Sequence, residues 1–172
     1  MLNSSAAVRG HHPRMMETAF EKLLALLADS GVRFIVVGGV AVTLNGYVRL
    51  TEDVDILLEP SRSNIDQFLA AMSGFGEGFA RELSGDDFTD EEGAIRIVEE
   101  VEQCQVDAFT RLGGQHYGDL LTDAETFRMG TRDIHYASRA ALIRLKQRSV
   151  REKDRLDVMA LRRLQENLPA LP

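Results

Sequence analysis

The sequence predicts an α/β (α+β) protein with a small mixed β-sheet flanked by helices. Apolar residues recur at helical spacing in several segments, which is typical of amphipathic helices. Between them lie short apolar runs rich in β-branched residues, such as Val32–Val37, which are typical of strands buried on both faces. Helices that alternate with a few such strands pack as layers around a mixed sheet.

The composition is that of an ordinary globular domain. Of 172 residues, 44% are hydrophobic and 27% are charged, which excludes a disordered or collagen-like chain. We expect a flexible leader over residues 1–14, in which His11 and His12 form at most a weak metal pair, and a single domain with C-terminal helices over residues 15–168.

Localisation signals are absent from the sequence, which predicts a cytoplasmic protein. Apolar runs are too short to cross a bilayer, and residues 1–14 lack the apolar segment of a signal peptide. The single cysteine, Cys104, cannot form an internal disulfide, which fits a reducing compartment.

The first half of the chain contains clear helix and strand signals. Gly31 suits the left-handed position that follows a helix, and the Gly38-Gly39 pair stops a strand and begins a helix. The expected elements are a helix from Met16 that ends at Asp29-Ser30-Gly31, a strand over Val32–Val37, a short helix over Val40–Leu44, a strand over Val54–Leu58 and a helix that begins after Ser61 or Ser63 and carries Ile65, Phe68, Leu69 and Met72.

The second half begins with a segment rich in glycine and aspartate over residues 74–92, for which we expect a long loop with at most one helical turn. The expected elements after it are strands over Ala94–Val98, Gln105–Phe109 and Ile134–Ala137, a helix from the capping residue Ser138 to about Ser149 and a last helix from Arg151 to about Leu164.

The net charge of −7 is unevenly distributed. Residues 77–102 hold ten acidic side chains against Arg81 and Arg96, whereas residues 139–163 hold nine basic side chains against three acidic ones. This pattern argues against general coating of nucleic acid and allows a local site for a phosphate-bearing ligand. A solvated, arginine-rich helix face explains the basic segment equally well.

The Gly38-Gly39 pair and two aspartates form the most informative pattern in the sequence. Glycine at the start of a helix lets the backbone approach a phosphate, and the free N–H groups there can bind it. Asp53 and Asp55 follow at the start of a strand, where residues two apart point to the same face. Two converging carboxylates repel each other unless a cation lies between them, and Mg²⁺ prefers such oxygen ligands.

A third carboxylate, Asp107, stands between apolar residues in the expected strand Gln105–Phe109. A carboxylate in such a strand needs a partner or a metal ion. Three carboxylates on neighbouring strands beside a glycine-led helix are typical of two-metal phosphoryl transfer. Arg96 or Arg111 could instead pair with Asp107.

The segment from Phe34 to Ile56, with its Gly-Gly pair and the sequence Gly-Tyr-Val-Arg-Leu-Thr-Glu-Asp-Val-Asp, resembles the nucleotidyltransferase superfamily with the DNA polymerase β-like fold. It is most similar to a small bacterial branch that includes nucleotidyltransferase toxins of abortive-infection type toxin–antitoxin systems. The resemblance covers about residues 30 to 165. Position 39 departs from the superfamily pattern, because many members have serine where this chain has glycine.

The resemblance implies roles for particular residues. Asp53, Asp55 and Asp107 would be catalytic and bind two Mg²⁺ ions, and Gly38 and Gly39 would contact the triphosphate of an NTP. In the toxin-like branch a helix offers a lysine, here Lys146, and then a basic-Lys-Asp pattern, here within Arg151–Asp157.

Other residues of these motifs have two interpretations each. Arg49 either neutralises phosphate or pairs with Glu52, and Thr51 either contacts the nucleotide or stabilises the turn. Lys146 could reach the nucleotide phosphates. Lys153, Asp154 and Asp157 could be site residues or form i, i+4 pairs along an exposed helix.

Three functions are compatible with these features. The first is a Mg²⁺-dependent nucleotidyltransferase that moves an NMP from an NTP to an acceptor hydroxyl. By resemblance the acceptor would be a tRNA 3′ end or a protein, with a cognate antitoxin as a further partner. The second is a catalytically silent binding or antitoxin module, which glycine at position 39 would suit. The third is a small antibiotic-modifying enzyme that attracts a cationic substrate through an acidic loop over residues 86–92.

Overall fold

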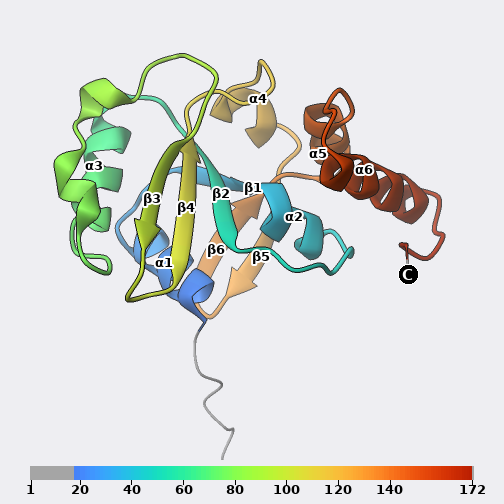
Figure 1. The fold of residues 1–172 in the computed structure, drawn as a ribbon, viewed down its shortest axis with the longest axis horizontal. Helices are drawn as coiled ribbons and strands as arrows, with labels where there is room; N and C mark the ends of the chain where they lie inside the picture. Colours follow the sequence, from blue (N-terminus) through green and yellow to red (C-terminus); the bar gives the residue numbers. More distant parts are fainter. Residues whose placement is uncertain (1–17, 172) are drawn as a thin grey trace, which may run out of the picture.

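The computed structural model describes residues 18–171. The leader predicted over residues 1–14, with His11 and His12, therefore lies outside the described residues. One mixed sheet with helices around it organises the described chain (Figure 1), so the predicted fold class is confirmed. None of the helices in this part of the chain is long and apolar enough to cross a lipid bilayer.

The sheet has six strands in the order β3-β4-β2-β1-β6-β5. Pairs β1–β2, β3–β4 and β5–β6 are antiparallel, whereas β2–β4 and β1–β6 are parallel. The strand bounds are β1 (Phe34–Val37), β2 (Asp53–Leu58), β3 (Ile95–Glu99), β4 (Cys104–Phe109), β5 (Glu125–Met129) and β6 (Arg132–Tyr136).

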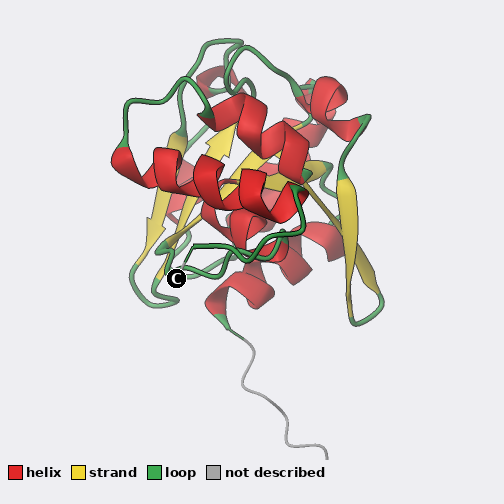
Figure 2. Ribbon diagram, turned by 90° about the vertical axis from the view of Figure 1, so that its right-hand side faces the viewer, coloured by secondary structure: helices red, strands yellow, loops and turns green. Residues whose placement is uncertain are grey.

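Helices surround this sheet, and three of them begin at side-chain caps, because a hydroxyl of Thr18, Ser61 or Ser138 accepts a free N–H of the first turn. Helices α5 and α6 lie next to each other in front of the sheet (Figure 2). The helix bounds are α1 (Ala19–Asp29), α2 (Gly38–Leu44), α3 (Arg62–Met72), α4 (Tyr117–Leu121), α5 (Arg139–Lys146) and α6 (Glu152–Gln165).

The central strands β1 and β2 carry the core. All four residues of β1 are buried, as expected for a strand covered on both faces. In β2 the buried residues Val54 and Ile56 alternate with the half-buried Asp53 and Asp55, so apolar and acidic side chains leave opposite faces of the strand. At the start of β2, one face is therefore apolar and the other carries the two aspartates.

Two elements were not predicted from the sequence. Strand β5 lies at the edge of the sheet, where only Phe127 and Met129 are partly covered, so it lacks a continuous apolar run. Its hairpin turn at Gly130, with φ +64°, was the available signal. Helix α4 has five residues, too few for a periodic pattern.

Several predicted boundaries were wrong by a few residues. The first strand begins at Phe34 rather than Val32, and α2 begins at Gly38 rather than Val40. Helix α5 ends at Lys146 rather than near Ser149. The predicted loop after α3 contains two short 3₁₀ helices, Phe79–Glu82 and Gly85–Asp87, instead of one turn at most.

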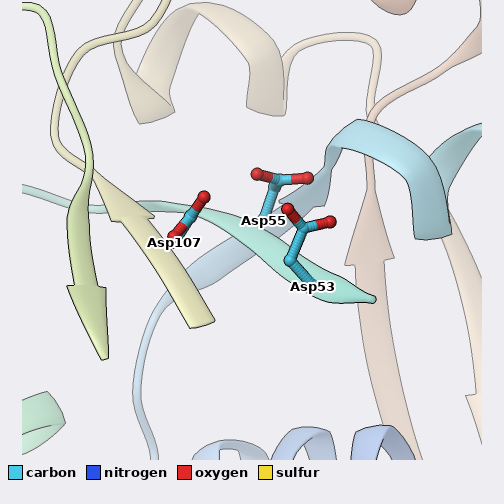
Figure 3. Close-up of side chains that lie close together, drawn as sticks. All are labelled: Asp53, Asp55 and Asp107. Atoms are coloured by element: carbon cyan, nitrogen blue, oxygen red, sulfur yellow. The ribbon is translucent and has the colours of Figure 1, made fainter. Parts of the chain in front are cut away.

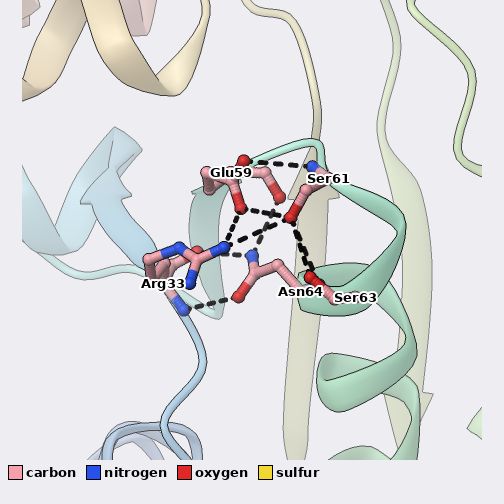
Figure 4. A network of polar contacts seen from close by, with 5 residues as sticks. All are labelled: Arg33, Glu59, Ser61, Ser63 and Asn64. Carbon is pink, nitrogen blue, oxygen red and sulfur yellow. Dashed lines mark hydrogen bonds and ion pairs between the residues drawn. The ribbon is translucent and has the colours of Figure 1, made fainter.

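A buried polar side chain, Asn64, joins the start of α3 to the ends of β1 and β2 (Figure 4). Its Oδ1 accepts the Arg33 backbone N–H at 2.8 Å. Its Nδ2 donates to the carbonyl oxygens of Arg33 at 2.9 Å and Glu59 at 2.8 Å. Because the Asn64 side chain is buried and contacts residues that flank both strands, it fixes the end of the sheet opposite the acidic residues of β2.

We predict that Asn64→Ala lowers the free energy of unfolding by about 2–3 kcal/mol, because it leaves a buried N–H and two carbonyl oxygens without their partner. Urea unfolding followed by circular dichroism measures this. The exposed neighbour Ser63 contacts Ser61 through one hydroxyl pair at 3.3 Å, and Ser63→Ala should change stability by no more than about 0.5 kcal/mol. Equal effects of the two changes would contradict this role of Asn64.

Candidate active site

Three carboxylates converge on the face of the sheet opposite the buried side chains of Val54 and Ile56 (Figure 3). Asp53 and Asp55 come from β2 and Asp107 from β4, and Asp55 lies directly across from Asp107 in the parallel register. One carboxylate oxygen from each residue lies within 4.8 Å of those of the other two. The structure thus brings together the three aspartates that the sequence singled out.

Burial and electrostatic repulsion both act on the carboxylates of this cluster. The pKa of Asp55 is raised to about 6, mainly by its removal from water and then by the negative charges of Asp53 and Asp107. The charge of Lys146 and a hydrogen bond from the Gly39 N–H act in the opposite direction. Asp55 therefore carries its charge at neutral pH only at a cost in free energy.

The donor atoms of the cluster suit a hard divalent cation. All three ligands are carboxylate oxygens, which Mg²⁺ prefers over nitrogen and sulfur, and a cation among them would remove their mutual repulsion. Within residues 18–171 this is the one group of at least three acidic, histidine or cysteine side chains close enough to share an ion. These residues fit a metal ion.

The glycine pair lets α2 begin directly against the acidic cluster. Gly38 has φ +62°, and a Cβ there would lie 1.8 Å from Oδ2 of Asp55. A Cβ on Gly39 would lie 2.7 Å from the Thr51 hydroxyl oxygen. Side chains at either position would collide with the site. Packing against Thr51 therefore accounts for glycine rather than serine at position 39.

Thr51 stabilises the start of β2 and does not line the cleft described below. Its hydroxyl lies 3.0 Å from Oδ1 and 3.2 Å from the carbonyl oxygen of Asp53. These contacts agree with the interpretation in which Thr51 stabilises the turn, and its contact with a nucleotide stays a prediction.

A buried ion-pair network fastens α5 and α6 to the loop before β2. Arg49 donates from Nε and Nη2 to Asp157 at 2.7 and 2.9 Å, and Lys146 Nζ lies 3.0 Å from the same carboxylate and 2.6 Å from Asp154. Of the two interpretations of Arg49, the pairing with Glu52 is wrong, because Asp157 is its partner, and contact with phosphate stays a prediction. Arg49 therefore acts as a clamp that joins the loop before β2 to α6, beside the acidic cluster.

The expectation of an exposed helix face at Asp157 was also wrong, because this residue is fully buried. It lies four residues before the buried Leu161, and this spacing was the signal that places it on the inner stripe of α6. Asp154 is covered too. Burial opposes its ionisation, but hydrogen bonds from Lys146 and Ser149 hold the pKa of Asp154 below its ordinary value.

A cleft of about 550 Å³ opens over the acidic cluster. Seven of the eight residues singled out in the sequence as catalytic, metal-binding or nucleotide-binding line it, and Thr51 is the exception: Gly38, Gly39, Arg49, Asp53, Asp55, Asp107 and Lys146. Other parts of its wall come from the loop before β3 and from α5 and α6, and a further part comes from the end of β4 and the segment after it. Apolar side chains of the wall include Phe109 at the end of β4, Leu112 in the segment after it, and Leu142 and Leu145 of α5.

Further charged residues of the cleft were missed as site residues. Arg96 on β3 pairs with Asp107 through both carboxylate oxygens, at 2.9 and 2.8 Å, so the alternative partner Arg96 is real and Arg111 lies instead near Glu92. Glu92 also lines the cleft, as does Arg151, which belongs to the basic-Lys-Asp pattern noted in the sequence. Arg96 had a sequence signal as well, because it lies in a strand predicted beside that of Asp107.

Asp55 gives a prediction on stability. Its folded pKa of about 6 exceeds the unfolded value of about 3.9, so the folded chain binds more protons in this interval and loses stability as the pH rises from about 4 to 6. At pH 7.5 in EDTA, Asp55→Asn should therefore raise the free energy of unfolding by up to about 3 kcal/mol, whereas at pH 4 the gain should disappear.

Urea unfolding at the two pH values measures this gain. Asp133→Asn is the control, because that carboxylate is exposed on the β5–β6 hairpin and pairs with Arg128, so its removal should change stability by less than about 1 kcal/mol. An Asp55→Asn variant less stable than the native protein at pH 7.5 would contradict the repulsion described here.

Comparison with known proteins agrees with this site. A family model described as "Nucleotidyl transferase of unknown function (DUF2204)" matches residues 16–169, which include every residue of the cleft. No curated protein matches the sequence. Because the model covers nearly the whole chain, this protein belongs to that family of nucleotidyl transferases.

Proposed function

We propose that this protein is a Mg²⁺-dependent enzyme that transfers an NMP from an NTP to an acceptor hydroxyl. The observation that carries the proposal is the convergence of Asp53, Asp55 and Asp107 beside the glycine-led start of α2. Membership of a nucleotidyl transferase family supports the same reaction class.

Asp53, Asp55 and Asp107 would hold the metal ions. Bound Mg²⁺ would neutralise charge on the phosphates and lower the pKa of the acceptor hydroxyl. Gly38 and Gly39 line the cleft beside the acidic cluster, where their backbone would meet the triphosphate. Lys146 lines the same cleft, with its ammonium group fixed by Asp154 and Asp157. Asp107 would face the acceptor. The acceptor hydroxyl would lose its proton to solvent water as its oxygen bonds to the α-phosphorus, and the bond from the α-phosphorus to the bridging oxygen would break to release pyrophosphate.

A basic surface beside the cleft favours an anionic acceptor, such as the 3′ end of a tRNA, over a protein hydroxyl. Arg148, Arg151, Lys153 and Arg155 are exposed and form no ion pair within residues 18–171. The neighbouring acids Asp154 and Asp157 are already neutralised by Lys146 and Arg49. Unpaired cations of this kind bind phosphate backbones. A role as the toxin of a toxin–antitoxin pair belongs to this proposal through the resemblance stated above.

The acidic loop gives less support to a cationic antibiotic as acceptor. Three of its carboxylates have partners in the chain: Asp86 pairs with Arg62, Asp90 with His116, and Glu92 accepts the Gly113 N–H at 3.0 Å. These contacts fix the loop and reduce the charge that it offers to a cationic substrate.

We predict that an NTP at about 100 times its Kd stabilises the protein by about 2.7 kcal/mol in the presence of Mg²⁺, and that EDTA removes this effect. Differential scanning fluorimetry with ATP, GTP, CTP and UTP measures it and reveals the preferred base. Asp55→Asn should abolish the shift and reduce transfer of a labelled NMP at least about 10³-fold, whereas Asp133→Asn should leave both unchanged. Full transfer by the Asp55 variant would contradict the proposal.

The acceptor side has its own prediction. Exchange of Arg148 and Arg155 for glutamine should raise the KM for an RNA acceptor and reduce the salt dependence of its binding by about two counterions, with the KM for NTP unchanged, because neither residue lines the cleft. The double change at Arg62 and Arg128, which are exposed elsewhere, is the charge-matched control. If the variant with both changes keeps the KM for the RNA acceptor and the salt dependence of its binding, this surface does not bind the acceptor.

A further inference from the structure

Arg96 stands in a row of charged side chains that crosses three strands. It lies directly opposite Asp107 in the antiparallel pair β3–β4, and Asp107 lies directly opposite Asp55 in the parallel pair β2–β4. Directly opposed residues project on the same face of a sheet. The guanidinium therefore adjoins the acidic cluster at its Asp107 side.

The contact between Arg96 and Asp107 uses both carboxylate oxygens. Nε donates to Oδ1 at 2.9 Å and Nη2 to Oδ2 at 2.8 Å, the two-pronged geometry of a strong arginine–carboxylate pair. Asp107 is also one of the three residues whose oxygens converge on the candidate metal position. Asp107 thus pairs with Arg96 in the metal-free protein and would bind a metal ion in the metal-loaded protein.

The two partners differ in how firmly they are held. The Asp107 side chain is 6% exposed and that of Arg96 is 59% exposed. The hydrogen bonds of Arg96 within residues 18–171 go to Asp107 alone, and Arg96 also lines the cleft. A long, exposed side chain with one partner can move away, whereas the carboxylate is fixed by the central sheet.

We propose that Arg96 is a positioning residue that takes the place of a metal ion at Asp107 in the metal-free protein and competes with the metal for that carboxylate. This inference rests on the proposed function. Arg96 keeps the acidic cluster folded without metal and weakens the binding of a bare divalent ion, because a guanidinium beside the cluster repels a second cation. Phosphate charge that arrives with the nucleotide offsets this repulsion, so the metal binds together with the NTP.

Titration of the nucleotide-free protein with Mn²⁺, followed by the electron paramagnetic resonance of the free ion, tests the inference. Arg96→Gln should bind Mn²⁺ at least about fivefold more tightly than the native protein. Arg128→Gln removes the same charge from an exposed pair with Asp133 on the distant hairpin and should leave the Kd unchanged. In EDTA, Arg96→Gln should melt at a lower temperature than the native protein, and saturating Mn²⁺ should remove that difference.

Other outcomes separate this inference from the proposed function. Equal or weaker Mn²⁺ binding by Arg96→Gln, with the native protein binding normally, would overturn the role of Arg96 and leave the proposed function intact. Absence of Mn²⁺ binding by both proteins, with and without NTP, would overturn both. If Arg96→Gln does not fold in EDTA, Arg96→Lys replaces it as the test variant. Lysine keeps the positive charge but loses the two-pronged contact with Asp107, so we expect this variant to bind Mn²⁺ more tightly than the native protein. Unchanged affinity in Arg96→Lys would then overturn the inference.

Discussion

Mutual repulsion of three carboxylates is the constraint on which the rest of this structure depends. Asp53, Asp55 and Asp107 lie within 4.8 Å of one another at the edge of the apolar core, where like charges are costly. The surrounding elements supply the compensation: β3 contributes Arg96, α5 contributes Lys146, and the start of α2 contributes the Gly39 N–H. Each of these compensating groups also lines the cleft, so stabilisation of the site and its proposed chemistry use the same residues.

A second charged cluster, in which one carboxylate pairs with two cations, holds helices α5 and α6 in place. Asp157 is fully buried, accepts hydrogen bonds from Arg49 and forms an ion pair with Lys146, which lies far from Arg49 in the sequence. A buried carboxylate with two such partners is costly to separate from either. The network therefore fixes α5 and α6 relative to β2, and with them the cleft wall that faces the acidic cluster. This explains why Arg49, although it lines the cleft, is a clamp in the described chain.

The sequence was sufficient for the parts of the fold that rest on local patterns. A continuous apolar run predicted β1, and the apolar residues around Asp55 predicted β2. Serine hydroxyls marked the starts of α3 and α5, and the two-residue spacing of Asp53 and Asp55 predicted their common face. Edge strand β5 was missed because one covered face leaves little apolar signal. The partners of Arg49 and Asp107 lie 108 and 11 residues away, and only the folded chain selects among the available charges. Residue types and spacing thus located the site, whereas its internal ion pairs required the tertiary structure.

The most direct test of the account is an anomalous difference map from crystals grown with Mn²⁺ and a non-hydrolysable NTP analogue. The account predicts a peak within about 2.5 Å of carboxylate oxygens of Asp53 and Asp55, with the triphosphate against Gly38 and Gly39. A nucleotide bound elsewhere, or density for the analogue without a metal peak at these aspartates, would contradict the central claim that the acidic cluster is a metal-dependent nucleotidyl transfer site.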